Sequence, residues 1–179
     1  MITTDLAAAV DAIAAALNDR QPRWALRPES PADRAFVDAL YASTRWEELS
    51  VLPWPDEAKR AFLHDQSRLQ GEHYRQHYPG AALHLLEHDG AAVGRIYLHV
   101  MPGEFRLMDI ALLPQWRGQG HGGRVLRALQ QVATAQRRRI SLHVEPNNPA
   151  QRLYARLGFE RGEQRGVYQY LSWLPPVLS

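Results

Sequence analysis

Residues 112–123 read LLPQWRGQGHGG, and they stand between a strand pattern and an amphipathic helix pattern. Glycine allows positive φ and a close approach of the backbone to a ligand. The first turn of a helix offers unpaired N–H groups and a partial positive charge, which favour phosphate. Arg117 adds a cation that can donate two hydrogen bonds. The stretch therefore has the properties of a pyrophosphate-binding turn, although a glycine-rich turn between a strand and a helix is also common without a ligand.

Two other phosphate-binding patterns do not fit this stretch. A P-loop needs Lys followed by Ser or Thr after its last glycine, and neither follows here. A Rossmann turn lies early in a βαβ unit and has an acidic residue after the next strand, whereas this turn follows three strands with no helix between them. Both nucleotide-binding classes are therefore excluded.

The surrounding sequence predicts one α/β domain with a mixed sheet. Helix patterns cover residues 4–18, 31–45, 56–76, 120–137 and 148–157, and strand patterns cover residues 24–27, 81–87, 92–100, 105–113, 139–145, 159–164 and 167–173. The turn pairs Asp89-Gly90 and Pro102-Gly103 separate three strands that follow one another. Because no helix lies between these strands, a doubly wound sheet is not expected.

A second stretch resolves most of the ambiguity of the first. Residues 142–159 read LHVEPNNPAQRLYARLGF. The two stretches together resemble the GNAT superfamily of acetyl-CoA-dependent N-acetyltransferases. The first is similar to the family pattern Gln/Arg-x-x-Gly-x-Gly/Ala, and the second to Asn-x-x-Ala-x-x-Leu-Tyr-x-x-Leu-Gly-Phe. The matching residues are Gln115, Gly118 and Gly120, then Asn147, Ala150, Leu153, Tyr154, Leu157, Gly158 and Phe159. The order of elements from Trp24 to Trp173 also agrees with this family.

The resemblance implies a fold and a cofactor site. The fold is of the α/β (α+β) type: a mixed, mostly antiparallel sheet of about seven strands flanked by helices. Its fourth and fifth strands, here ending near Leu112 and Val144, splay apart and hold acetyl-CoA in the gap. Implied cofactor contacts are the backbone of Ile110, Ala111 and Leu112 for the pantetheine arm, the N–H groups of Arg117, Gly118, Gln119, Gly120, His121 and Gly122 for the pyrophosphate, and Asn147, Ala150 and Tyr154.

Acyl transfer to an amine needs an acid for the leaving thiolate. Tyr154 matches the tyrosine that serves as the general acid in the family, where it points at the sulfur of CoA. The alternative is a tyrosine that only packs on the domain, with its hydroxyl at the edge.

The same reaction needs the attacking amine to lose a proton, and three alternatives remain open for that base. Glu104 stands where some members that acetylate protein N-termini carry a glutamate, and Asp109 lies nearer the thioester on the same strand. In the third alternative no side chain acts as the base. A regular strand places Glu104 and Asp109 on opposite faces, but a bulge would change that parity. Asp109 is alternatively a structural acid, and Glu145 either orients acceptor or water or is a solvated loop residue.

Composition excludes several function classes. The chain has 179 residues, of which 45% are hydrophobic and 22% charged, so a single globular domain is expected. It has no cysteine, which excludes disulfides, cysteine nucleophiles and an acetyl-cysteine intermediate. The net charge of +2 with scattered arginines gives no dense basic stripe, so no nucleic-acid partner is expected. No apolar run is long enough for a membrane span.

The first 20 residues lie outside the resemblance. They are Ala-rich and carry Asp5 and Asp11, which argues against a secretory signal and favours a cytoplasmic protein. Residues 1–20 are expected to form an appended helix, with residues 21–179 forming the acetyltransferase domain. The helix either packs on that domain or forms the contact of a homodimer.

We therefore predict an enzyme that transfers acetyl directly from acetyl-CoA to a primary amine of a small molecule or a peptide. The alternative is a non-catalytic module that binds acyl-CoA. The region of residues 46–78 is expected to shape the acceptor pocket, where Glu47, Glu48, Gln66 and Glu72 are candidates to bind a cationic amine. His73 and His77 share a helix face, but no third ligand is evident, so no metal site is expected.

Overall fold

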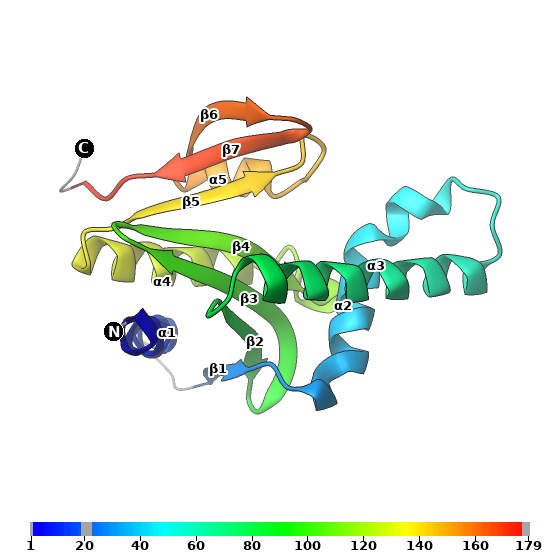
Figure 1. Ribbon diagram of the computed structural model, residues 1–179, viewed down its shortest axis with the longest axis horizontal. Helices are drawn as coiled ribbons and strands as arrows, with labels where there is room; N and C mark the ends of the chain where they lie inside the picture. Colours follow the sequence, from blue (N-terminus) through cyan, green and yellow to red (C-terminus); the bar gives the residue numbers. More distant parts are fainter. Residues whose placement is uncertain (1, 19–22, 177–179) are drawn as a thin grey trace.

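A computed structural model of the chain describes residues 2–18 and 23–176. Its centre is a seven-stranded sheet with the order β1-β2-β3-β4-β5-β7-β6 (Figure 1). The strands are β1 (Trp24–Pro28), β2 (Ala82–His88), β3 (Ala91–Met101), β4 (Glu104–Leu112), β5 (Arg139–Val144), β6 (Glu160–Arg165) and β7 (Tyr168–Trp173). Neighbouring strands are antiparallel except for the parallel pair β4–β5. The predicted fold class is confirmed.

The helices agree with the sequence patterns to within a few residues. They are α1 (Ile2–Leu17), α2 (Arg34–Ser50), α3 (Asp56–His77), α4 (His121–Ala135) and α5 (Gln151–Arg156), with short 3₁₀ turns η1 (Pro31–Asp33) and η2 (Pro114–Trp116). The helix α2 continues past the expected end at Arg45, and α5 begins later than residue 148. No helix in the described ranges is long and apolar enough to cross a membrane.

The two parallel strands separate partway along their length. β4 and β5 pair from Glu104 with Arg139 to Leu107 with Leu142, and both strands then continue without pairing to each other. The register between β3 and β4 shifts at the same level, because Tyr97 pairs with Asp109 while Leu98 pairs with Leu107. The extra residue on β4 is a bulge, which bends a strand and changes which face its side chains take. The expected splay and bulge are both present.

One face of the sheet carries the main apolar core. Strand residues such as Ile96, Leu98, Phe105 and Leu142 alternate onto this face, and α1 and α4 cover it. The helix α1 packs on the domain, because its apolar side is part of this core: Ala9, Val10, Ile13 and Leu17 are all buried. These side chains are therefore not available to a second copy of the chain. Arg124 of α4 also donates a hydrogen bond to the carbonyl of Leu17, at 2.6 Å.

The opposite face of the sheet is polar, and α2 and α3 lie over it (Figure 1). The residues that alternate onto this face are those between the core positions, and they include Arg95, Tyr97, His99, Arg106 and Ser141. Several of them are buried although they are polar or charged, so their hydrogen-bond partners must lie within the protein. The two candidate bases, Glu104 and Asp109, lie on this face.

The contribution of α1 can be tested at Ile13, whose side chain has no exposed surface. Replacing Ile13 by Ala removes buried methylene groups and leaves a cavity, which should lower the free energy of unfolding by about 2–5 kcal/mol. Urea denaturation measures this loss. Ala15→Ser, on the exposed side of the same helix, should change it by less than about 0.5 kcal/mol. Equal effects of the two substitutions would contradict the built-in role of α1.

Candidate active site

The glycine-rich turn has the backbone geometry of an anion cradle. Gly118 and Gly120 have φ of 69° and 84°, in the left-handed region that glycine tolerates, and Gly120 is the N-cap of α4. A Cβ added at either position would meet nothing within 4 Å, so the space in front of the turn is open. The N–H groups of Gly118, Gln119 and Gly120 find no acceptor in the described part of the chain. These donors and the first turn of α4 face the same opening.

The guanidinium of Arg117 is committed to the protein rather than to this opening. Its Nε donates to the Leu112 carbonyl at 2.7 Å, and its other nitrogens reach the carbonyl and hydroxyl of Ser43 at 3.3 and 2.8 Å. The N–H of Arg117 bonds to the Pro114 carbonyl at 3.2 Å. Arg117 therefore ties α2 to the end of β4, whereas its sequence position suggested a free phosphate ligand.

A cluster of aromatic rings packs at the glycine-rich turn. Trp116 and His121 of the turn pack against Trp24 and His88 of β1 and β2, with ring centroids 4.9–6.0 Å apart. Burial lowers the pKa of His121, and the nearby His88 and Arg124 lower it further. A neutral, packed His121 fixes the first residue of α4. Its side chain contributes by packing, and only its backbone is free for an anion.

The walls of the splay are the unpaired ends of β4 and β5. Ile110, Ala111 and Leu112 pair with β3 on one side only, because β5 has already diverged. Their backbone is held close to β3: a Cβ at Gly94 would collide with the carbonyl oxygen of Ala111. Only glycine fits opposite this segment, so the position of β4 at the open end is closely defined.

The turn after β5 leaves one asparagine side chain free. The side chain of Asn148 accepts a hydrogen bond from the N–H of Ala150 at 2.9 Å and so caps the turn before α5. Asn147 makes no such bond in the described ranges and lines a groove of about 390 Å³ with Glu48, Glu145, Pro146 and Val167. Asn147, the asparagine that is expected to contact the cofactor, is therefore the one whose side chain is free to do so.

Tyr154 of α5 lies beside the splay. Its side chain is 5% exposed, and its ring packs edge-on against Phe159 at 5.5 Å. Burial raises the pKa of Tyr154, and the negative charge of Asp109 raises it further. The hydroxyl has no hydrogen-bond partner among the described residues, so its proton is free for a ligand.

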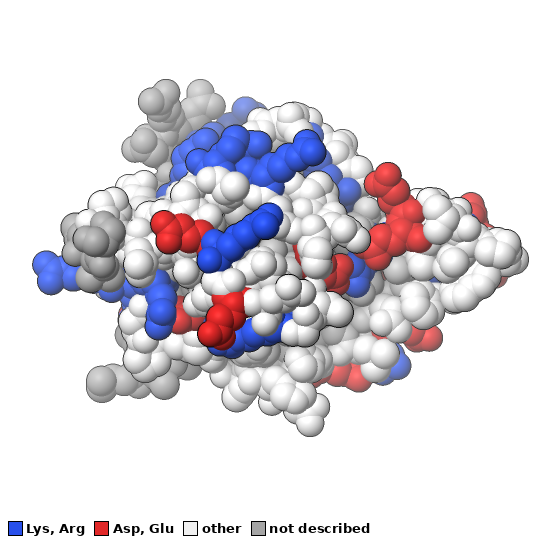
Figure 2. Space-filling view, turned by 90° about the horizontal axis from the view of Figure 1, so that it is seen from above, with Lys and Arg blue, Asp and Glu red and all other residues white. Residues whose placement is uncertain are grey.

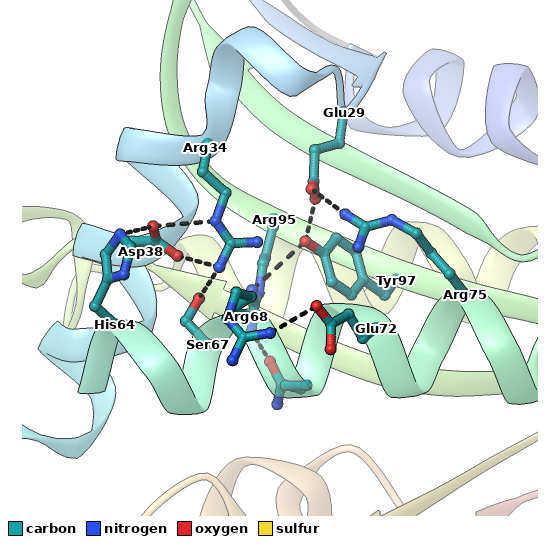
Figure 3. A network of polar contacts seen from close by, with 11 residues as sticks. Glu29, Arg34, Asp38, His64, Ser67, Arg68, Glu72, Arg75, Arg95 and Tyr97 are labelled. Carbon is teal, nitrogen blue, oxygen red and sulfur yellow. Dashed lines mark hydrogen bonds and ion pairs between the residues drawn. The ribbon is translucent and has the colours of Figure 1, made fainter. Parts of the chain in front are cut away.

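Asp109 is held by a buried arginine. The Nε of Arg95 lies 2.6 Å from its carboxylate, and Arg95 is only 3% exposed. Gln70 of α3 accepts a hydrogen bond from the same guanidinium at 2.9 Å, and the ring of Tyr97 lies 4.7 Å from it. Figure 3 shows Arg95 and Tyr97 beneath α3, within a network that also includes Glu29 and Arg75. This carboxylate therefore has a structural partner on the neighbouring strand.

Glu104 lies at the closed end of the strands. It pairs with Arg139 on β5 and is 7% exposed. Burial alone would raise the pKa of Glu104, but hydrogen bonds from Ser141 and Arg106 and the charges of Arg106 and Arg139 outweigh it and lower the pKa. Six strand positions, roughly 20 Å, separate it from Ile110. The structure therefore does not bring Glu104 together with Tyr154 and Asp109.

Sequence analysis missed one residue of this face, His143. It is the first residue of β5 beyond the last rung of β4–β5 pairing, and it alternates with the core residues Leu142 and Val144. The Nδ1 of its ring lies 3.3 Å from a guanidinium nitrogen of Arg106. The alternation of Ile140, Leu142 and Val144 in the sequence was the signal that could have found it.

An ion pair crosses the open end of the splay. Arg45 of α2 lies 2.8 Å from Glu145, just after β5, and 3.2 Å from Glu48. Because Arg117 ties α2 to β4, this second link connects the β4 side to the β5 side. Glu145 is therefore paired rather than freely solvated.

The surface around α2 and α3 is acidic. Figure 2 shows Asp and Glu at the end of the molecule formed by these helices, while the rest of this view carries Lys and Arg mixed with further Asp and Glu. The exposed acids of these helices and the turn between them are Glu47, Glu48, Asp56, Glu57, Asp65 and Glu72, against the exposed arginines Arg60, Arg68 and Arg75. Such a surface attracts cations. Within the described residues no group of three or more His, Asp or Glu side chains is arranged to hold a metal ion.

Comparison with known proteins gives a family match over much of the chain. Residues 37–159 match the model of the acetyltransferase (GNAT) family. A Bacillus subtilis (strain 168) protein, provisionally named as a ribosomal protein bS18-alanine N-acetyltransferase, is 30% identical over 118 residues, which are 65% of this chain and 70% of that protein.

Solved structures agree on the fold. The PaiA N-acetyltransferase of Thermoplasma acidophilum, solved with coenzyme A, has a TM-score of 0.61 at 15% identity, covering 84% of this chain and 98% of that one. RimL, a ribosomal L7/L12 alpha-N-protein acetyltransferase also solved with coenzyme A, has a TM-score of 0.58 at 14% identity, covering 86% and 94%. At this identity the likeness shows the fold alone.

The cradle can be tested at Gly120. Replacing Gly120 by Glu places bulk and negative charge in the opening, so the affinity for coenzyme A should fall at least tenfold, measured by calorimetric titration. Gly80→Glu is the matched control, because Gly80 has φ of 80° and an equally open environment away from the turn. Both substitutions carry a backbone strain of about 1–3 kcal/mol. Equal coenzyme A affinity in the two variants would refute the cradle.

Proposed function

The chain belongs to the acetyltransferase (GNAT) family, and from this we propose that it transfers an acetyl group from acetyl-CoA directly to a primary amine. The observation that carries the proposal is the open row of N–H donors at Gly118–Gly120, set at the start of α4 and beside the splayed ends of β4 and β5. A diphosphate is satisfied by oriented donors at a helix N-terminus, and a neutral amide arm is satisfied by free strand backbone. Relatives solved with coenzyme A support this choice of co-substrate.

The residues of the chain have distinct parts in the proposed transfer. Acetyl-CoA supplies the activated acyl group as a thioester. Unpaired backbone at Ile110 and Ala111 orients the arm, the carbonyl of Leu112 being held by Arg117, and Asn147 offers the arm an amide. The amine nitrogen forms a bond to the acyl carbon while the carbon–sulfur bond breaks, and Tyr154 donates its hydroxyl proton to the sulfur. The raised pKa of Tyr154 supports an acid that keeps its proton until the thiolate leaves.

Of the three alternatives for the base, the contacts favour the one without a side-chain base. Glu104 is engaged by Ser141 and Arg106 at the closed end, and Asp109 is engaged by Arg95. A carboxylate whose oxygens already accept hydrogen bonds from arginine has fewer lone pairs available to an ammonium group. We propose that the proton of the ammonium leaves through water in the groove at Glu145 and Asn147.

A peptide α-amine is the acceptor to test first. The relative from Bacillus subtilis is named for the alanine N-terminus of a ribosomal protein, and this chain is similar to it over two thirds of that protein. The acidic surface of α2 and α3 supports an acceptor with positive charge. Small amines belong in the same screen, because the fold alone does not distinguish them.

Cofactor binding is testable without an acceptor. Acetyl-CoA at about 100 times its dissociation constant should add about 2.7 kcal/mol of stability. For a chain of this length that raises the melting temperature by about 5–10 °C. ATP and NAD are the controls and should give no comparable shift. A chain that melts at the same temperature with and without acetyl-CoA would contradict the proposed reaction.

The role of Tyr154 predicts a specific kinetic change. Tyr154→Phe removes the acid but keeps the packing, so kcat should fall about 10²–10⁴-fold while the KM for acetyl-CoA changes little. The exposed Tyr168 provides the control Tyr168→Phe, which should leave both constants unchanged. Because the pKa of Tyr154 is raised, the wild-type kcat should not decline up to about pH 10, the ordinary pKa of tyrosine. Unchanged kcat in Tyr154→Phe would exclude it as the acid.

A further inference from the structure

His143 stands where the substrate gap begins. It follows the last rung of β4–β5 pairing, at Leu107 and Leu142, on the polar face of the sheet that α2 and α3 cover. Its ring packs edge-on against Tyr170 of β7 at 5.4 Å. The proposed transfer, as derived above, gives this titratable side chain no part.

Contacts on one edge of the ring determine which nitrogen carries the proton. A guanidinium nitrogen of Arg106 lies 3.3 Å from Nδ1. Arginine only donates hydrogen bonds, so Nδ1 accepts, and in the neutral ring the proton is on Nε2. The hydrogen of Nε2 has no acceptor among the residues of 23–176, which makes it the free polar group of this side chain.

Arg106 is itself held in place. Its Nε lies 2.6 Å from the Ser141 hydroxyl and 3.3 Å from the Glu104 carboxylate, which a second nitrogen reaches at 3.1 Å. Glu104 is also paired with Arg139 at 3.0 Å. The contacts that join Glu104, Arg106 and His143 thus extend from the closed end of the strands to the start of the gap. Glu104 acts through Arg106, which makes it a positioning residue rather than a base.

The charges around the ring oppose its protonation. Arg106 of β4 and Arg165 of β6 both face it, while Glu104 is the facing acid and Tyr170 of β7 is neutral. Burial lowers the pKa of His143, and the two arginines lower it further against the smaller opposite effect of Glu104. The ring is therefore neutral at pH 7, and its basic nitrogen is covered by Arg106.

We propose that His143 is a fixed hydrogen-bond donor that selects the acceptor, through its Nε2–H, and not the base of the reaction. The inference rests on the proposed acetyl transfer and names the acceptor class within it. The group that this donor recognises is a carbonyl oxygen next to the attacking amine. A peptide N-terminus carries that carbonyl and a simple alkyl amine does not, so the site prefers α-amino amides.

The kinetic test compares two substitutions with two acceptors. His143→Gln keeps an N–H donor near the position of Nε2, whereas His143→Phe keeps only the ring. With alanyl-peptide amides, His143→Phe should raise the acceptor KM about tenfold, the value of one good hydrogen bond, and His143→Gln should stay within about threefold of wild type. With n-propylamine, both variants should match wild type.

The matched control is His99, which pairs with Arg106 on the other side, on β3. Burial and Arg106 lower the pKa of His99 as well, but β3 lies away from the gap. His99→Phe should therefore leave the KM for the peptide unchanged. A loss of kcat with both acceptors in both His143 variants, together with loss of the acidic limb of the pH profile, would mean that His143 is a base and would overturn the proposal.

A spectroscopic test is independent of turnover. Nitrogen-15 NMR of the wild-type imidazoles, with His143→Gln used for assignment, should show His143 protonated at Nε2 and titrating below the ordinary histidine pKa of about 6.5. In Arg106→Met the pKa should rise towards that value. Protonation at Nδ1 in the wild type would refute the donor. If the NMR result holds but neither acceptor is acetylated, the proposed transfer fails, and this inference fails with it.

Discussion

The site depends on the point at which β4 and β5 stop pairing. Parallel strands joined by a helix are normally paired over most of their length, and here the rungs end at Leu107 and Leu142. Beyond that level each strand keeps its outer neighbour, so the backbone groups that face the gap have no partner in the sheet. Unpaired backbone groups inside a protein are costly, and a ligand with amide groups compensates for them. The missing hydrogen bonds of the gap therefore support its proposed role as a binding site.

Arginines hold the two sides of this gap in position. Arg117 joins the end of β4 to α2, and Arg45 joins α2 to Glu145 after β5. Arg95 and Arg106 are placed beneath the helices, where Asp109 and Glu104 neutralise them. A planar guanidinium donates several hydrogen bonds in fixed directions, which suits a role as a connector. The two acids that looked most like bases are the counterions of these connectors.

Much of the fold could be predicted from the sequence, because alternation and turn residues locate elements with little tertiary context. The segments 92–100 and 139–145 show this, since their apolar residues become core positions of β3 and β5. The packing of α1 against the core could not be predicted in this way. An Ala-rich apolar helix face has the same sequence pattern whether it packs on its own domain or on a second copy of the chain. The glycine-rich turn could be located from the sequence, because its backbone has positive φ at positions 118 and 120, where glycine is favoured. The functions of Arg117, Glu104 and His143 depend on partners 35 or more residues away, and no local pattern contains them.

The cradle uses backbone groups whereas the proposed acceptor side uses side chains, and this difference bears on substrate specificity. The donors of the cradle are N–H groups, which almost any residue supplies, and only the two positions with positive φ demand glycine. The side chains of His143 and Glu145 lie on the polar face under α2 and α3 and that of Tyr154 lies on α5, and each is adjusted by its own neighbours. Under the proposed function, a change in one of these side chains would alter which amine fits without moving a donor of the cradle. In the proposed transfer, recognition of the acyl donor and choice of the acceptor are therefore separable, because they use different parts of the same chain.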